Sequence, residues 1–141
     1  MRAVVVDTNV VVSGLITGHD DAPPARILDG MLSGRFPFVV SEALLAEYRD
    51  VLNRPKLRKR HGLAPDEIES LLVALAHNAI VLEPSAGPAA PEPGDQFLWN
   101  LLVSHEGLCL VTGDALLLRA RNAPASVLSP AAFISSGAKL Q

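Results

Sequence analysis

At 141 residues, with 49% hydrophobic and 19% charged residues, the chain is long enough for one folded domain and too short for two. Its formal net charge of −3 argues against a protein that holds nucleic acid through a broad basic surface. A single cysteine excludes a disulfide framework, and no apolar stretch is long enough to span a bilayer, so we expect a soluble, cytoplasmic protein.

The sequence alternates apolar runs with helical patterns, which indicates the α/β class. In chain order, the first half predicts strand 2–7, helical residues around 10–17, helix 24–34, strand 36–40, helix 42–53 and, beyond the basic stretch 56–62, helix 65–77. The second half predicts strand 79–82, a proline-rich loop over 83–94, helix 95–106, strand 108–112, helix 114–120, strand 125–128 and a helical turn at 130–135. One domain is expected over residues 1–136, with a frayed tail over 137–141.

Two carboxylates follow predicted strands directly. Asp7 comes after the apolar run 3–6, and Asp114 comes shortly after the run 108–111. Such runs, without polar alternation, are typical of strands that are covered on both faces in a parallel sheet. Because ligands bind beyond the carboxyl ends of such strands, we expect the two acids to face one another across one site.

Helical phase selects a third carboxylate in the helix after Ser41. The apolar residues of that helix form one stripe, made up of Leu44, Leu45, Tyr48, Val51 and Leu52. At about 100° per residue, Glu47 lies on the flank of this stripe, whereas Glu42 points away from it. Glu42 is explained as a first-turn acid that complements the helix dipole, so Glu47 is the better site candidate.

A fourth carboxylate, Asp95, opens a predicted helix after the breaker pair Pro93-Gly94. An acid at a helix start is more often an N-cap than a ligand, but Asp95 joins three other acids. Four neighbouring carboxylates raise one another's pKa values unless a cation lies between them. Oxygen ligands without His or Cys suit Mg²⁺ or Mn²⁺, and such a site supports hydrolysis of a phosphodiester by one ion or two.

Short polar side chains near the strand ends are candidates for orienting the carboxylates: Thr8, Asn9, Ser13 and Thr112. For Thr8 and Asn9, capping of a helix or turn is an equally good interpretation.

The motifs that carry a family resemblance are Val5–Val10 with Ser13, Val40–Tyr48, Val51–Lys56, Gly94–Leu98, Leu110–Asp114 and Leu128–Pro130. In this order and at these spacings, the sequence resembles the PIN domain family of metal-dependent ribonucleases, particularly the toxins of bacterial type II toxin–antitoxin pairs. The resemblance implies a three-layer α/β/α fold with a central parallel sheet of about four to five strands. It also implies that Asp7, Glu47, Asp95 and Asp114 hold Mg²⁺ or Mn²⁺, Glu47 either directly or through water. RNA as substrate, a cognate antitoxin and a homodimer are further expectations.

Five of the twelve Lys and Arg residues lie close together, namely Arg54, Lys56, Arg58, Lys59 and Arg60. They either contact RNA phosphates beside the acids, which would make affinity dependent on salt, or form a solvated helix end that complements the C-terminal dipole. Both interpretations stay open from the sequence.

Two other functions compete with a ribonuclease. A catalytically inactive PIN-like module would bind RNA or protein without turnover, but retention of all four acids favours the enzyme. A phospho-acceptor receiver domain also places aspartates at strand ends, but it requires an acidic pair after the first strand and a lysine after the last, and neither is present.

Overall fold

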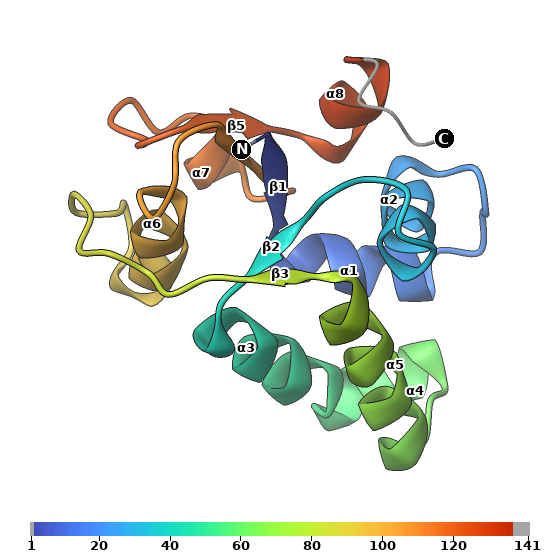
Figure 1. Cartoon of the computed structure of the whole chain (residues 1–141). Coiled ribbons are helices and arrows are strands. Elements are labelled where there is room, and N and C mark those ends of the chain that lie inside the picture. Colours follow the sequence, from blue (N-terminus) through green and yellow to red (C-terminus); the bar gives the residue numbers. More distant parts are fainter. Residues whose placement is uncertain (1, 137–141) are drawn as a thin grey trace.

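Within the described residues, five short parallel strands lie at the centre of the fold, and helices pack around them (Figure 1). The structure is a computed structural model and describes residues 2–136, so the expected tail at 137–141 lies outside the described residues. The strands are β1 (Ala3–Val6), β2 (Val39–Val40), β3 (Ile80–Val81), β4 (Leu108–Val111) and β5 (Ser126–Leu128).

The strands form two parallel groups that meet at a single bridge. One sheet has the order β1-β4-β5, and the other pairs β2 with β3. An isolated parallel bridge joins Val4 of β1 to Phe38, just before β2, and the Val4 amide donates to the Pro37 carbonyl at 3.2 Å. The spatial order is therefore β3-β2-β1-β4-β5, which places β1 in the middle. The predicted α/β class with a parallel sheet is confirmed.

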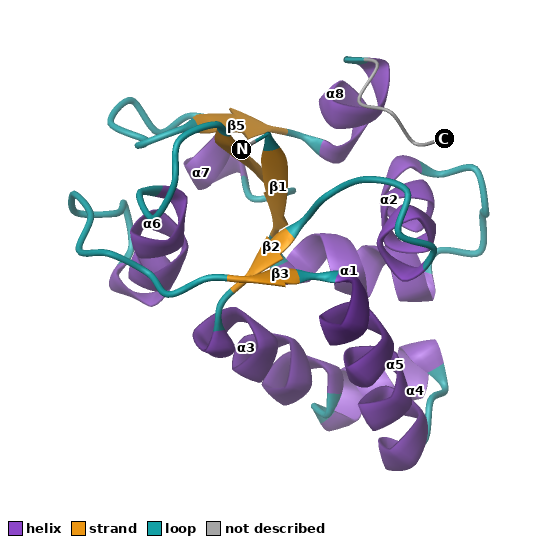
Figure 2. Cartoon of the chain, in the orientation of Figure 1, coloured by secondary structure: helices purple, strands orange, loops and turns teal. Residues whose placement is uncertain are grey.

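Helices occupy most of the remaining chain, as Figure 2 shows in purple. They are α1 (Thr8–Ile16), α2 (Pro23–Leu32), α3 (Glu42–Leu52), α4 (Pro55–His61), α5 (Pro65–Asn78), α6 (Gln96–Leu102), α7 (Ala115–Leu118) and α8 (Pro130–Ser135), and a 3-10 turn η1 (Pro93–Asp95) precedes α6. Proline suits the first turn of a helix, because the amide it lacks has no intrahelical partner there. In Figure 1, α3, α4 and α5 gather at one end of the molecule, while α2 and α6 lie on opposite sides of β1.

The core lies where the helices meet the strands. Val5 and Val6 of β1 are fully buried, as the continuous apolar run predicts for a central parallel strand. The largest fully buried side chains include Trp99, Tyr48 and Phe38. Within the described residues, no helix is both long enough and apolar enough to cross a membrane.

The basic stretch after Pro55 differs from the sequence prediction. It was expected to connect two helices, but it forms α4, a helix of its own. Pro55 occupies the first turn of α4, and Gly62 ends it with a φ of 72°, a left-handed conformation that favours glycine. Helix α6 is also shorter than predicted and ends at Leu102 rather than near residue 106.

Candidate active site

Asp7 lies at the carboxyl end of β1 and is buried, with 5% of its surface exposed. Its Oδ1 accepts a hydrogen bond from the Thr8 amide at 2.8 Å, so the side chain caps α1. Its Oδ2 accepts bonds from the Thr112 hydroxyl at 2.7 Å and from the Asn9 side-chain amide at 3.1 Å. These three donors fix the Asp7 carboxylate at the end of the strand.

The end of β4 meets the same carboxylate. Val6 pairs with Val111 in the parallel register, so Thr112 arrives beside Asp7. The Thr112 hydroxyl also accepts a bond from the Asp114 amide at 3.0 Å, and thus links the Asp7 carboxylate to the backbone that follows β4. The Asp114 carboxylate accepts a bond from the Leu116 amide at 2.9 Å and caps α7.

Asn9 and Ser13 differ in what they contact. The Asn9 side chain spans the two strand ends, because its Oδ1 also accepts a bond from the Gly113 amide at 2.9 Å. Ser13 lies one turn further along α1, and its side chain makes no hydrogen bond within residues 2–136. The structure therefore brings Thr8, Asn9 and Thr112 into contact with the acids, but not Ser13.

Helix α3 brings Glu47 to the same place. The Thr8 hydroxyl donates a hydrogen bond to the Glu47 carboxylate, whereas Glu42 is exposed at the start of the helix. The next residue, Tyr48, is fully buried, and its hydroxyl donates to the carbonyl of Val6, directly before Asp7. The sequence interpretation of Tyr48 as a core residue overlooked this bond. A buried tyrosine hydroxyl needs a partner, which was the available signal.

Asp95 lies at the junction of η1 and α6, and it is half-buried. It occupies the N-cap position of α6, yet its side chain makes no capping hydrogen bond. The pKa of Asp95 is raised to about 6, first by burial and then by the charges of Asp7, Asp114 and Glu47. The N-cap interpretation therefore does not account for this carboxylate. The negative charges of the other three acids act on it instead.

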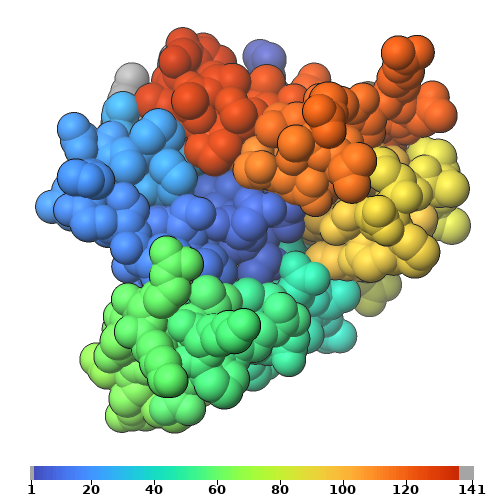
Figure 3. All heavy atoms as spheres, turned by 180° about the vertical axis from the view of Figure 1, so that it is seen from behind, coloured from blue at the N-terminus to red at the C-terminus, as the bar shows by residue number. Residues whose placement is uncertain are grey.

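Mutual repulsion also acts on Asp7. Burial raises its pKa most, and the charges of Glu47 and Asp114 raise it further, against the hydrogen bonds from Thr112 and the Thr8 amide. Figure 3 shows the blue N-terminal segment bordered by teal, yellow and orange segments from later parts of the chain, and the acids on those segments act on one another electrostatically. Residues far apart in the sequence thus form one negatively charged region.

The loop before Asp95 is braced by α6. The Gln96 side chain accepts a bond from the Ala90 amide and donates to the Pro88 carbonyl, each at 2.9 Å. The Asn100 side chain accepts from the Gly87 amide at 3.0 Å. These contacts hold the long connection between β3 and η1 against the helix that begins after Asp95.

The donor set of the region consists of carboxylate, hydroxyl and amide oxygens, which suits a hard divalent cation rather than a soft one. Among residues 2–136, no three His, Cys, Asp or Glu side chains converge closely enough to surround an ion as they stand. The raised pKa values of Asp7 and Asp95 mark a place where added positive charge would relieve repulsion.

The predicted RNA contacts, Arg54 to Arg60, are exposed at and around α4, outside this group of acids.

Comparison with known proteins agrees with this architecture. Among curated proteins, no relative matches the chain. The sequence model of the PIN domain matches residues 3–116, which include β1, β4 and all four acids. The chain belongs to the PIN domain family, whose members are generally nucleases.

Proposed function

We propose that the protein is a Mg²⁺- or Mn²⁺-dependent endoribonuclease that hydrolyses RNA phosphodiester bonds at the acidic cluster. The observation that carries the proposal is Asp95, a half-buried carboxylate without a capping bond whose pKa is raised first by burial and then by the charges of Asp7, Asp114 and Glu47. Membership of a family of nucleases supports the same chemistry. RNA as the substrate is supported by the likeness of the motifs to PIN-family ribonucleases.

Asp7, Glu47, Asp95 and Asp114 would hold the ion. When bound there, a divalent cation polarises a phosphodiester and lowers the pKa of water. Thr8 and Thr112 keep the Glu47 and Asp7 carboxylates oriented through the bonds that they donate. Burial of Asp7 limits its contact with bulk water, which strengthens its attraction for positive charge.

The direct test replaces an aspartate with asparagine, which has nearly the same shape and can still accept hydrogen bonds. Asp7→Asn and Asp114→Asn should each lower Mn²⁺-dependent cleavage of RNA by about 10²-fold or more, because each removes a charge from the ion's surroundings. Glu42→Gln is the matched control, since it removes an exposed acid from α3, and its activity should equal that of the wild type. Cleavage is followed on labelled RNA, with circular dichroism as a check of folding.

If the wild type, free of any bound partner, cleaves no RNA in the presence of either ion, the enzyme proposal fails. An inactive RNA- or protein-binding module would then be favoured, and it would also show no stabilisation by Mn²⁺.

We further propose that the enzyme acts as the toxin of a toxin–antitoxin pair, functions as a homodimer and is restrained by a protein that covers the acids. The support is the likeness of its motifs to such toxins. Expression in a bacterial host should arrest growth, and Asp7→Asn should abolish the arrest. Growth arrest that persists in the Asp7 variant would show that toxicity does not depend on the proposed RNA cleavage.

A further inference from the structure

Helix α4 carries a cluster of exposed cations on a protein whose net charge is −3. The exposed cations of α4 are Lys56, Arg58, Lys59 and Arg60. Within the part of the chain that the structure describes, the two ion pairs involve other residues, so none of these four is neutralised by a carboxylate. An exposed group of cations without counter-charges attracts a polyanion.

This basic helix lies next to the elements that carry the acids. Helix α4 packs against α1, which begins with Thr8, and against α3, which carries Glu47. In Figure 3, the green surface of α4 borders the blue surface of α1. A chain bound at the acids therefore needs to extend only a short way to reach α4.

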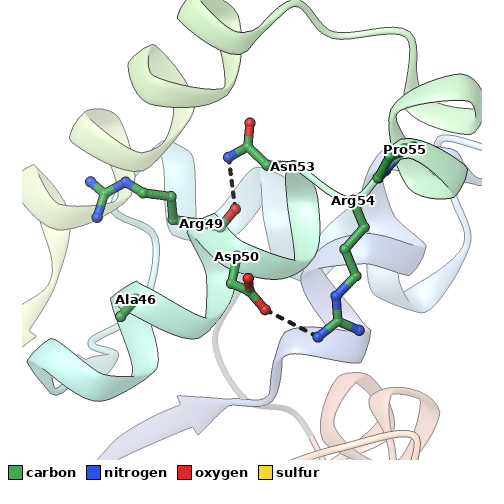
Figure 4. A pocket seen from close by; sticks show the side chains of 6 residues that line it. All are labelled: Ala46, Arg49, Asp50, Asn53, Arg54 and Pro55. Carbon is green, nitrogen blue, oxygen red and sulfur yellow. Dashed lines mark hydrogen bonds and ion pairs between the residues drawn. The ribbon is translucent and has the colours of Figure 1, made fainter.

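A surface hollow of about 540 Å³ lies on α3 and reaches the start of α4. Its lining, drawn in Figure 4, consists of Ala46, Arg49, Asp50, Asn53, Arg54 and Pro55. Ala46 is the neighbour of Glu47, and Pro55 is the first residue of α4. The hollow thus runs along one face of α3, from the residue before Glu47 to the first residue of α4.

Two arginines flank the hollow and point in opposite directions (Figure 4). Arg49 pairs with Glu69 at 2.8 Å, and Arg54 pairs with Asp50 at 3.1 Å. The Arg54–Asp50 pair is well exposed, with 61% and 71% of the two side chains accessible. Exposed pairs are weak and screened by salt, so a phosphate can replace Asp50 as the partner of Arg54.

We propose that a single RNA strand bound at the acids continues through this hollow and across α4, with its phosphates on Arg54 and the four cations of α4. This inference rests on the proposed ribonuclease function. Contacts to phosphates position a strand without reading its sequence, so this surface provides affinity and register rather than choice of bases. A single strand is the occupant because its flexible backbone can bring a phosphodiester to half-buried carboxylates.

The competing role for these cations is local. Arg58, Lys59 and Arg60 occupy the last turn of α4, where they complement the helix dipole. That role affects stability but does not depend on the length of a substrate. Substrate length therefore separates the two roles.

The test uses a variant that carries Lys56→Gln, Arg58→Gln, Lys59→Gln and Arg60→Gln, since glutamine retains good helix propensity. Its matched control carries Arg2→Gln, Arg26→Gln, Arg35→Gln and Arg121→Gln, which also removes four exposed cations. For each protein, kcat/KM is measured with Mn²⁺ on a dinucleotide and on an RNA of roughly twelve nucleotides, at several salt concentrations.

The ratio of kcat/KM for the long RNA to that for the dinucleotide should fall about tenfold or more in the α4 variant but not in the control. The slope of log affinity against log salt for the long RNA should become shallower by up to about 3. An α4 variant whose ratio and slope equal those of the control, with only a lower melting temperature, would overturn the proposal. If the wild type cleaves neither RNA, the nuclease proposal fails, and fluorescence anisotropy with the long RNA still tests the surface.

Discussion

The four acids differ in how much of their bonding capacity the fold already uses. Asp7 and Asp114 cap α1 and α7, and Glu47 accepts a bond from Thr8. Asp95 makes no capping bond. Asparagine can keep a cap where alanine removes it, so substitutions to asparagine test charge at these positions rather than helix stability.

Tyr48 helps to fix the position of Asp7 relative to Glu47, through its hydrogen bond to Val6. Tyr48→Phe removes the bond to the Val6 carbonyl and should cost about 1 kcal/mol of stability, but it should also lower kcat about tenfold or more because α3 loses one of its hydrogen bonds to the end of β1. Urea unfolding and cleavage kinetics measure the two effects.

Ile68→Val is the control for Tyr48→Phe, because it trims a fully buried residue of α5 at a similar cost of about 0.5–1.5 kcal/mol. Its kcat should match the wild type. Equal losses of kcat in the two variants would mean that Tyr48 acts only through stability.

At this scale, the sequence could predict which acids lie at strand ends and which glutamate of α3 faces them, because strand ends and helical phase follow from local patterns. It could not predict the bond of Thr8 to Glu47, which joins residues 39 positions apart, or that of Thr112 to Asp7, which joins residues 105 apart. Those bonds depend on the sheet register and on the packing of α3.

At the scale of elements, close contact between α1 and α2 depends on Gly14. A Cβ at this position would lie 2.8 Å from the Pro24 carbonyl oxygen and 3.0 Å from the Leu28 Cβ, which are on α2. The glycine therefore lets the two helices approach, and α1 is the helix that begins beside Asp7.

Gly14→Ala should lower the free energy of unfolding by about 1–3 kcal/mol from overpacking, which outweighs a helix-propensity gain of about 1 kcal/mol. Urea unfolding checks this. Gly18→Ala is the control, since a Cβ there meets nothing within 4 Å. A Gly14→Ala protein as stable as the wild type would show that α2 can move away without cost.

The predicted elements agree with the structure where hydrophobic period and caps coincide, as in α3, whose cap Ser41 accepts a bond from the Leu44 amide at 3.1 Å. Helix α4 was missed because it buries no residue fully and has no apolar stripe to detect. The division of the strands into two groups joined at Val4 also follows from tertiary packing, which no local pattern encodes.

For the whole molecule, gathering the acids makes stability depend on pH and on ions. The pKa of Asp95 is about 6 in the folded chain, whereas the ordinary value for an aspartate is 3.8. Unfolding therefore releases a proton when the pH lies between these two values. Without added metal, stability should therefore fall as the pH rises through that window. The stability that is lost in this window should not return at higher pH.

Thermal melts of metal-free protein check this dependence, and Asp95→Asn should flatten it. At neutral pH, Mn²⁺ at about a hundred times its Kd should restore about 2.7 kcal/mol. A protein carrying both Asp7→Asn and Asp114→Asn should lose this response. Stability that rises with pH between 4 and 6, or melts unaffected by Mn²⁺, would contradict the prediction.

The pairing of β1 with β4 has a consequence for synthesis on the ribosome. Asp7 is made early, but its partner Thr112 and the fourth acid, Asp114, come more than a hundred residues later. An emerging chain therefore holds its first catalytic candidate next to an empty sheet edge until β4 has been translated. The proposed acidic cluster can therefore be completed only after most of the chain has been synthesised.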